Sequence, residues 1–162
     1  MPVTVRPAVP GDYDAICDLM QELDAFHIEL RPEILQPYTG RARTREHVSR
    51  YIGNEQRIMF LAELDGQAAG LAAVETVSMP EHPMFRMPVI AMLMELVALP
   101  SHRRNGVGRL LLDSVRAWTV EHGIGCLQVN VQSGNEAALR FYQAMGFGPF
   151  LQRLWMFPGQ SS

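Results

Sequence analysis

Apolar residues recur at three- and four-residue spacing in four stretches of this chain. That spacing is the pattern of a helix with one buried face. One predicted helix starts at 10–12 and carries apolar residues through Leu23, and the others span 44–54, 107–122 and 135–145. Gly123 and Gly146 follow the last two of these stretches, and glycine commonly ends a helix.

Between these helices the pattern is typical of strands. Residues 89–99 are almost continuously apolar, which predicts a central strand. The other predicted strands are 3–5, the hairpin 57–64 and 67–77, 127–131, and a last one at 150–157. The segments 27–40 and 78–88 carry prolines and break the pattern, so we interpret them as loops. This order predicts an α/β fold with a mixed sheet, antiparallel early and parallel where the helix 107–122 crosses between two strands.

Length and composition narrow the class of protein. The 162 residues fit one domain, 1–162, with a core that needs no disulfide or metal. Cys17 and Cys126 lie far apart and outside any zinc-type spacing, which favours a reducing compartment and no metal site. The N-terminus lacks a signal-peptide pattern and no apolar run reaches membrane-spanning length, so we expect a cytoplasmic, soluble protein. The net charge of −3 argues against nucleic-acid binding, and we interpret the basic run 40–50 as a solvated helix face.

The stretch "PSHRRNGVGRLLLDSVRAW" joins the central strand to a helix through a turn with Gly106 and Gly108. A helix start exposes unpaired N–H groups, and glycine lets an anion approach them closely. The alternative is a turn that needs glycine only for its geometry. A P-loop is excluded because the chain contains no lysine, and the GxGxxG fingerprint fails because no third glycine follows.

Two sequence motifs follow one another along the chain. The first is an Arg followed by x-x-Gly-x-Gly, matched by Arg103, Gly106 and Gly108 after the strand "ELVALP". The second, within "NEAALRFYQAMGF", is an Asn followed by Phe-Tyr and Gly-Phe, matched by Asn135, Phe141-Tyr142 and Gly146-Phe147. In this order the two motifs resemble those of the GNAT superfamily of acyl-CoA-dependent N-acetyltransferases. The resemblance implies a single GNAT-like domain with about six to seven strands, about four helices and splayed central parallel strands.

The resemblance also implies acetyl-CoA as co-substrate. Its pyrophosphate would bind the helix start, formed by Arg103, Arg104, Asn105, Gly106, Val107, Gly108 and Arg109. Its pantetheine amides would pair with a strand edge at Leu96, Val97 and Ala98. For this the strands ending near Leu99 and starting near Leu127 must separate, as they do in the family.

Catalytic roles are implied for two side chains. In the family a tyrosine at the position of Tyr142 protonates the leaving thiolate, whereas the alternative is a packed aromatic residue. Asn135 can cap its helix and also hold CoA. Glu95 is the only acid inside the central strand and is a candidate general base, although an ion pair would equally explain it. Glu75, His82, His27 and water are the competing bases.

These observations predict an N-acetyltransferase that moves an acetyl group to a primary amine by direct attack in a ternary complex. A non-catalytic acyl-CoA-binding module and a nucleotide-binding domain unrelated to CoA are the alternatives. The acceptor is predicted to be a small-molecule or peptide amine, bound by the segments 26–40 and 78–88, and a homodimer stays open. Four acidic residues are candidates for holding a cationic amine: Asp24, Glu29, Glu33 and Glu81.

Overall fold

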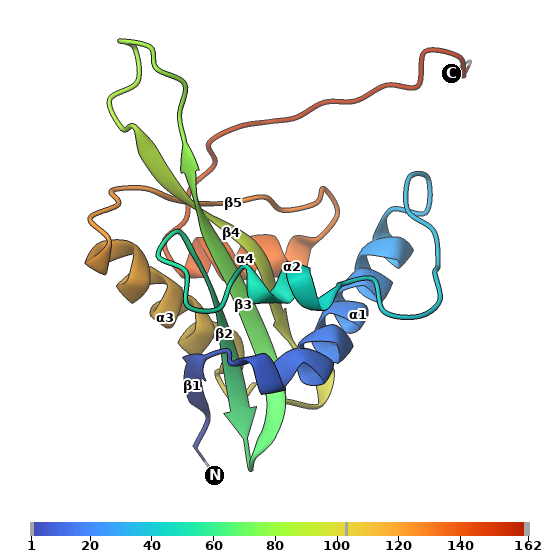
Figure 1. Ribbon diagram of the computed structural model, residues 1–162. Helices are drawn as coiled ribbons and strands as arrows, with labels where there is room; N and C mark the ends of the chain where they lie inside the picture. Colours follow the sequence, from blue (N-terminus) through green and yellow to red (C-terminus); the bar gives the residue numbers. More distant parts are fainter. Residues whose placement is uncertain (1, 103, 161–162) are drawn as a thin grey trace. The chain divides into compact units, whose positions relative to one another are not determined.

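The structure is a computed structural model that describes residues 2–102 and 104–160, and a single mixed sheet forms its framework (Figure 1). The strands of this sheet are β1 (Thr4–Pro7), β2 (Arg57–Leu64), β3 (Gln67–Ser78), β4 (Val89–Ala98) and β5 (Leu127–Val129). They lie in the order β1-β2-β3-β4-β5, antiparallel through β4, and β4 pairs with β5 in parallel. The α/β class and the mixed sheet are confirmed, with five strands among the described residues rather than six to seven.

Helices cover both faces of the sheet (Figure 1). α1 (Tyr13–Leu30) and α2 (Arg45–Ser49) lie on one face, and α3 (Val107–Glu121) lies on the other. The fourth helix, α4, spans Glu136–Ala144, and short 3-10 turns occupy Pro10–Asp12 and Pro100–His102. Thr44 accepts a hydrogen bond from the His47 N–H at 3.1 Å, so the predicted N-cap of the second helix is confirmed.

The face under α1 and α2 holds one apolar core. Its side chains come from both helices and from the facing positions of β2, β3 and β4, among them Ile16, Leu19, Met20, Val48, Met59, Leu61, Leu71 and Val97. Glu95 lies on the same face as this core, because it pairs with Ala73, which pairs with Met59. The acidic side chain of the central strand is therefore directed toward α1 and α2.

On the opposite face α3 approaches the sheet closely at Gly70. A Cβ at this glycine would lie 2.6 Å from Val107 Cγ1 and 2.7 Å from the Val97 carbonyl oxygen. Real Cβ atoms do not come so near a backbone oxygen, so only glycine allows this contact. Gly70 thereby brings the start of α3 against β3 beside the end of β4.

Several predicted boundaries are wrong. Residues 27–30, assigned to a loop, complete α1, and the second helix ends at Ser49 rather than near Asn54. The strand predicted at 127–131 ends at Val129. The segment 150–157 forms no strand in the described structure, and its apolar side chains are exposed, with Phe150 at 80% and Leu154 at 82%.

The chain divides into two compact units, one ending at Asn130 and the other beginning at Val131. The first unit contains the sheet, α1, α2 and α3, and the second contains α4 and the segment that follows it. Among the described residues, no helix combines the length and apolar character needed to cross a membrane.

Candidate active site

A β-bulge interrupts the central strand β4 at Met94. Ala73 pairs with Glu95 and the next residue of β3, Val74, pairs with Leu93, so Met94 is the extra residue. The parallel ladder between β4 and β5 also ends here, because its last pair is Leu93 with Val129. Beyond the bulge no described strand pairs with this side of β4, because β5 also ends at Val129.

The free edge of β4 presents backbone groups of alternate residues. The Leu99 N–H donates to the Ala69 carbonyl at 2.9 Å, which directs the amide groups of Leu99 toward β3. Because successive residues of a strand alternate, Val97 also faces β3, and Leu96 and Ala98 face the free edge. An extended ligand with amide groups can pair with Leu96 and Ala98, in the manner of an added strand.

A turn with two left-handed residues follows this edge. Arg104 has φ of 73° and Gly106 has φ of 76°, and α3 starts at the next residue, Val107. No side chain among the described residues caps this helix, so its first N–H groups stay available for an anion. Asn105 in this turn and Arg109 in the first turn of α3 are exposed, and the predicted contact at Arg103 lies outside the described residues.

Gly106 and Gly108 are glycines for different reasons. Gly106 needs its positive φ, which L side chains rarely adopt. Gly108 lies inside the first turn of α3, where any residue can take the helical conformation. The absence of a side chain at Gly108 therefore has no conformational cause, and a glycine here would let an anion approach the helix start closely.

Glu95, directly after the bulge, lies in a partly buried cluster of charges. Its side chain is 28% exposed, and Arg43 Nη2 lies 3.7 Å from Glu95 Oε1. Arg43 is in turn paired with Asp24, and the Tyr38 hydroxyl donates to Asp24 Oδ2 at 2.6 Å. Burial raises the pKa of the Glu95 carboxyl, Arg43 opposes this rise and Asp24 adds to it.

The competing carboxylate, Glu75, is already hydrogen-bonded. The Tyr51 hydroxyl donates to Glu75 Oε2 at 3.2 Å, and Arg57 Nε lies 4.0 Å from the same oxygen. Burial and this carboxylate raise the pKa of Tyr51 to about 12, so its hydroxyl stays a donor at neutral pH. No described side chain donates a hydrogen bond to Glu95, which leaves its oxygens open to accept a proton.

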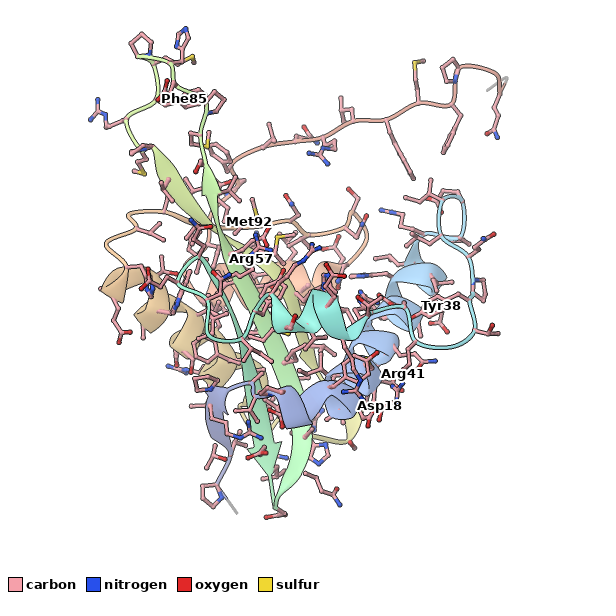
Figure 2. All side chains as sticks on the ribbon, viewed as in Figure 1. Asp18, Tyr38, Arg41, Arg57, Phe85 and Met92 are labelled. Carbon is pink, nitrogen blue, oxygen red and sulfur yellow. The ribbon has the colours of Figure 1, made fainter. Side chains whose placement is uncertain are left out.

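The predicted histidine bases lie in different surroundings. His82 is exposed in the loop between β3 and β4, the loop in which Figure 2 labels Phe85. Its Nδ1 accepts the Met84 N–H at 3.2 Å, which uses that lone pair within the loop. His27 lies on α1, and burial lowers its pKa below the ordinary value.

Asn135 and Tyr142 belong to the second unit. The Asn135 side chain accepts the Ala138 N–H at 3.2 Å and caps α4, which confirms its predicted structural role. Tyr142 is buried, with ring centroids 5.2 Å from Phe141 and 5.4 Å from Phe147 in edge-on contacts. The ring of Tyr142 is therefore fixed by aromatic neighbours within its own unit.

Sequence reasoning missed Arg43 and Tyr38. Arg43 lies in the basic run 40–50, interpreted as a solvated helix face, yet its side chain is only 18% exposed and precedes the helix. Asp24 is not a free acceptor for a cationic amine, because Arg43 already neutralises it. The only signal in the sequence was an arginine directly before an N-cap, which does not indicate burial.

The residues described, 2–102 and 104–160, include no group of three or more His, Cys, Asp or Glu side chains that could hold a metal ion.

Comparison with known proteins identifies a family. Residues 20–147 match the family model described as the acetyltransferase (GNAT) family, which covers both the bulged strand and α4. The ribosomal protein bS18-alanine N-acetyltransferase of Escherichia coli K12 is 26% identical over 123 residues, which are 76% of this chain and 72% of that protein. Streptothricin acetyltransferase of Streptomyces lavendulae is 28% identical over 93 residues, 57% of this chain and 45% of that protein.

Solved structures share the fold at lower sequence identity. A mutant of the BH1408 protein from Bacillus halodurans superposes with a TM-score of 0.87 at 17% identity, covering 94% of this chain and 98% of that chain. The aminoglycoside 6'-N-acetyltransferase AAC(6')-Ih from Acinetobacter baumannii gives a TM-score of 0.74 at 16% identity, with 98% and 99% covered. AAC(6')-Iy in complex with a CoA-containing bisubstrate analog gives 0.69 at 20% identity, with 97% and 98% covered.

Proposed function

The chain belongs to the acetyltransferase (GNAT) family, and from this membership we propose that it transfers the acetyl group of acetyl-CoA to a primary amine by direct attack in a ternary complex. The observation that carries the proposal is the bulge at Met94. It frees the edge of β4 and is followed at once by Glu95, and residues 99–106 connect β4 to the uncapped start of α3.

The residues of the first unit suit acetyl-CoA. The N–H groups from Arg104 to Arg109 can bind the pyrophosphate, with Arg103, Arg104 and Arg109 adding positive charge. Leu96 and Ala98 can pair with the pantetheine amides, and Val97 keeps this edge in register with β3. Bound in this way, acetyl-CoA supplies the acetyl group as a thioester.

Proton transfer completes the proposed reaction. The amine nitrogen forms a bond to the acetyl carbonyl carbon, the C–S bond breaks, and the amine proton passes to Glu95 directly or through water. Burial favours this role, because it raises the pKa of Glu95 and makes the carboxylate a stronger base. Tyr142 donates a proton to the leaving thiolate, with its ring held by Phe141 and Phe147.

Amine-dependent release of CoA tests the proposal. Purified protein is incubated with acetyl-CoA and a panel of amines, namely a polyamine, an amino acid, an aminoglycoside and a peptide with a free N-terminus, and free thiol is measured. The proposal predicts thiol release that depends on at least one amine. Binding of acetyl-CoA without release in any mixture would instead support an acyl-CoA-binding module.

A second measurement separates CoA binding from nucleotide binding. Competition against a bound fluorescent CoA analogue should be strong with CoA and weak with ATP, because ATP offers no amide groups to the edge of β4. Competition by ATP but not by CoA would support a nucleotide-binding domain.

A further inference from the structure

Arg43 connects the predicted base to the segment between α1 and α2. Its Nη2 lies 3.0 Å from Asp24 Oδ1 and 3.7 Å from Glu95 Oε1, and both Arg43 and Asp24 are more than four-fifths buried. Tyr38 donates to the same aspartate from this segment. One guanidinium thus bridges an acid of α1 and the acid after the bulge of β4.

We propose that Arg43 is a positioning residue for Glu95: anchored by Asp24, it places a positive charge beside the Glu95 carboxylate and favours its ionised form. The inference rests on the proposed function, because it concerns the residue that we assign as the base.

The distances suit a positioning role. At 3.7 Å the Arg43–Glu95 pair is electrostatic and falls short of a direct hydrogen bond, so Glu95 keeps its oxygens for an incoming proton. At Asp24 the same guanidinium uses both terminal nitrogens, a two-point contact that fixes its orientation. Burial alone would keep Glu95 protonated to higher pH, and the positive charge of Arg43 opposes that effect.

Other charged and titratable groups surround this pair. Asp24 and Tyr51 interact with Glu95 directly, and the groups linked to it through Arg43, Asp24 or Tyr51 come from α1, the segment before α2, α2, β2 and β3: His27, Tyr38, His47, Arg57 and Glu75. Burial lowers the pKa of His27 and of His47, so both are mainly neutral near pH 7. The positive charge of Arg57 offsets the negative charge of Glu75. Arg43 is therefore the cation that acts on Glu95.

The test is the pH dependence of kcat/KM in Arg43→Met. Removing the guanidinium raises the pKa of Glu95 further, so the acidic limb of the profile should move to higher pH. Above that limb activity should return to within about threefold of wild type. Arg43→Lys keeps the charge and should leave the limb near its wild-type position.

Arg41→Met is the matched control. Arg41 is in the same segment but pairs with Asp18 and Asp14 on the exposed side of α1, away from Met92 on the sheet (Figure 2). Removal of the Arg41 guanidinium should leave the acidic limb of the pH–rate profile at its wild-type position. An equal shift in Arg41→Met and Arg43→Met would overturn the inference, because general loss of positive charge would explain both.

Two comparisons separate the inference from the proposed function. If the acidic limb persists in Glu95→Gln, the base assignment fails and the inference fails with it. If Glu95→Gln abolishes the limb and Arg43→Met lowers activity equally at every pH, only the role of Arg43 is refuted. Should Arg43→Met be inactive, NMR titration of ¹³C-labelled glutamate carboxyls reads the pKa of Glu95 without turnover, and an unchanged value would refute the inference.

Discussion

Glu95 and Glu75 are both glutamates within strands, but their surroundings differ. Both lie on the face of the sheet that α1 and α2 cover, and Glu75 accepts the Tyr51 hydroxyl, whereas no described donor bonds to Glu95. The oxygens of Glu95 are therefore open to accept a proton, whereas one oxygen of Glu75 is already engaged. This difference in local environment is the reason that we propose Glu95 rather than Glu75 as the base.

Glu95→Gln keeps the shape of the side chain and removes its charge. Because the base must be ionised, wild-type activity should fall as pH drops through the raised pKa of Glu95, and this acidic limb should vanish in the variant. The affinity for acetyl-CoA should stay near wild type. Glu75→Gln is the matched control and should retain the limb, and the reverse result would transfer the role to Glu75.

Tyr142→Phe removes one hydroxyl and keeps the packed ring. A phenol is protonated at neutral pH and can protonate the departing thiolate, and loss of a positioned general acid typically lowers the rate about 10²–10⁴-fold. Acetyl-CoA affinity, measured by titration calorimetry, should change little. Turnover within about threefold of wild type would make Tyr142 a packing residue only.

At the scale of single residues, the sequence singled out residues with a recognisable local pattern and missed residues whose role depends on contacts with distant parts of the chain. Glu95 could be found because an acid within an apolar strand is unusual, and Asn135 because an N-cap has a local pattern. Arg43 and Tyr38 could not be found, because their partners Glu95 and Asp24 lie 52 and 14 positions away along the chain. Contacts of that kind depend on how α1 packs against β4.

At the scale of helices and strands, the close contact between α3 and β3 at Gly70 positions the start of α3, where we predict that an anion binds. Gly70→Ala would put a methyl group within 3 Å of the Val97 carbonyl and of Val107, and the backbone oxygen cannot move aside. Overpacking of this kind typically costs about 1–3 kcal/mol. We expect a loss of that size in the free energy of unfolding, measured by urea denaturation.

Gly11→Ala is the control for this variant. No atom lies within 4 Å of the position of its Cβ, and its φ is not positive, so stability should change by less than about 0.5 kcal/mol. Equal stability of Gly70→Ala and Gly11→Ala would show that α3 can shift without cost.

Helices and inner strands were predictable because their apolar period is local. The bulge at Met94 was not, since it depends on the register of β4 against β3 and no residue type specifies it. The last predicted strand, 150–157, has a strand-like pattern but no ladder in the described structure. A strand forms only where a neighbouring strand pairs with it, and the sequence of one segment does not specify which neighbour that is.

For the molecule as a whole, binding of acetyl-CoA should increase the free energy of unfolding. A ligand that binds only the folded state adds about 2.7 kcal/mol at a hundredfold excess over its Kd. Acetyl-CoA should therefore raise the Tm of the wild-type protein. Gly108→Val should remove most of this rise, because a branched side chain would occupy the open start of α3.

The free protein provides the control for that variant. Valine is no worse than glycine inside a helix, so the Tm of Gly108→Val without ligand should not fall through helix propensity. An undiminished rise with acetyl-CoA in Gly108→Val would show that the anion binds elsewhere.

The central claim is direct transfer of the acetyl group from acetyl-CoA to an amine, and mass spectrometry with ¹³C-acetyl-CoA tests it most directly. The protein is first mixed with labelled acetyl-CoA alone, and an amine that supports thiol release is then added. Direct attack predicts an unchanged protein mass in the first step, followed by labelled amide and free CoA in equal amounts. A labelled acetyl-protein that passes its label to the amine, or CoA release without labelled amide, would contradict the account.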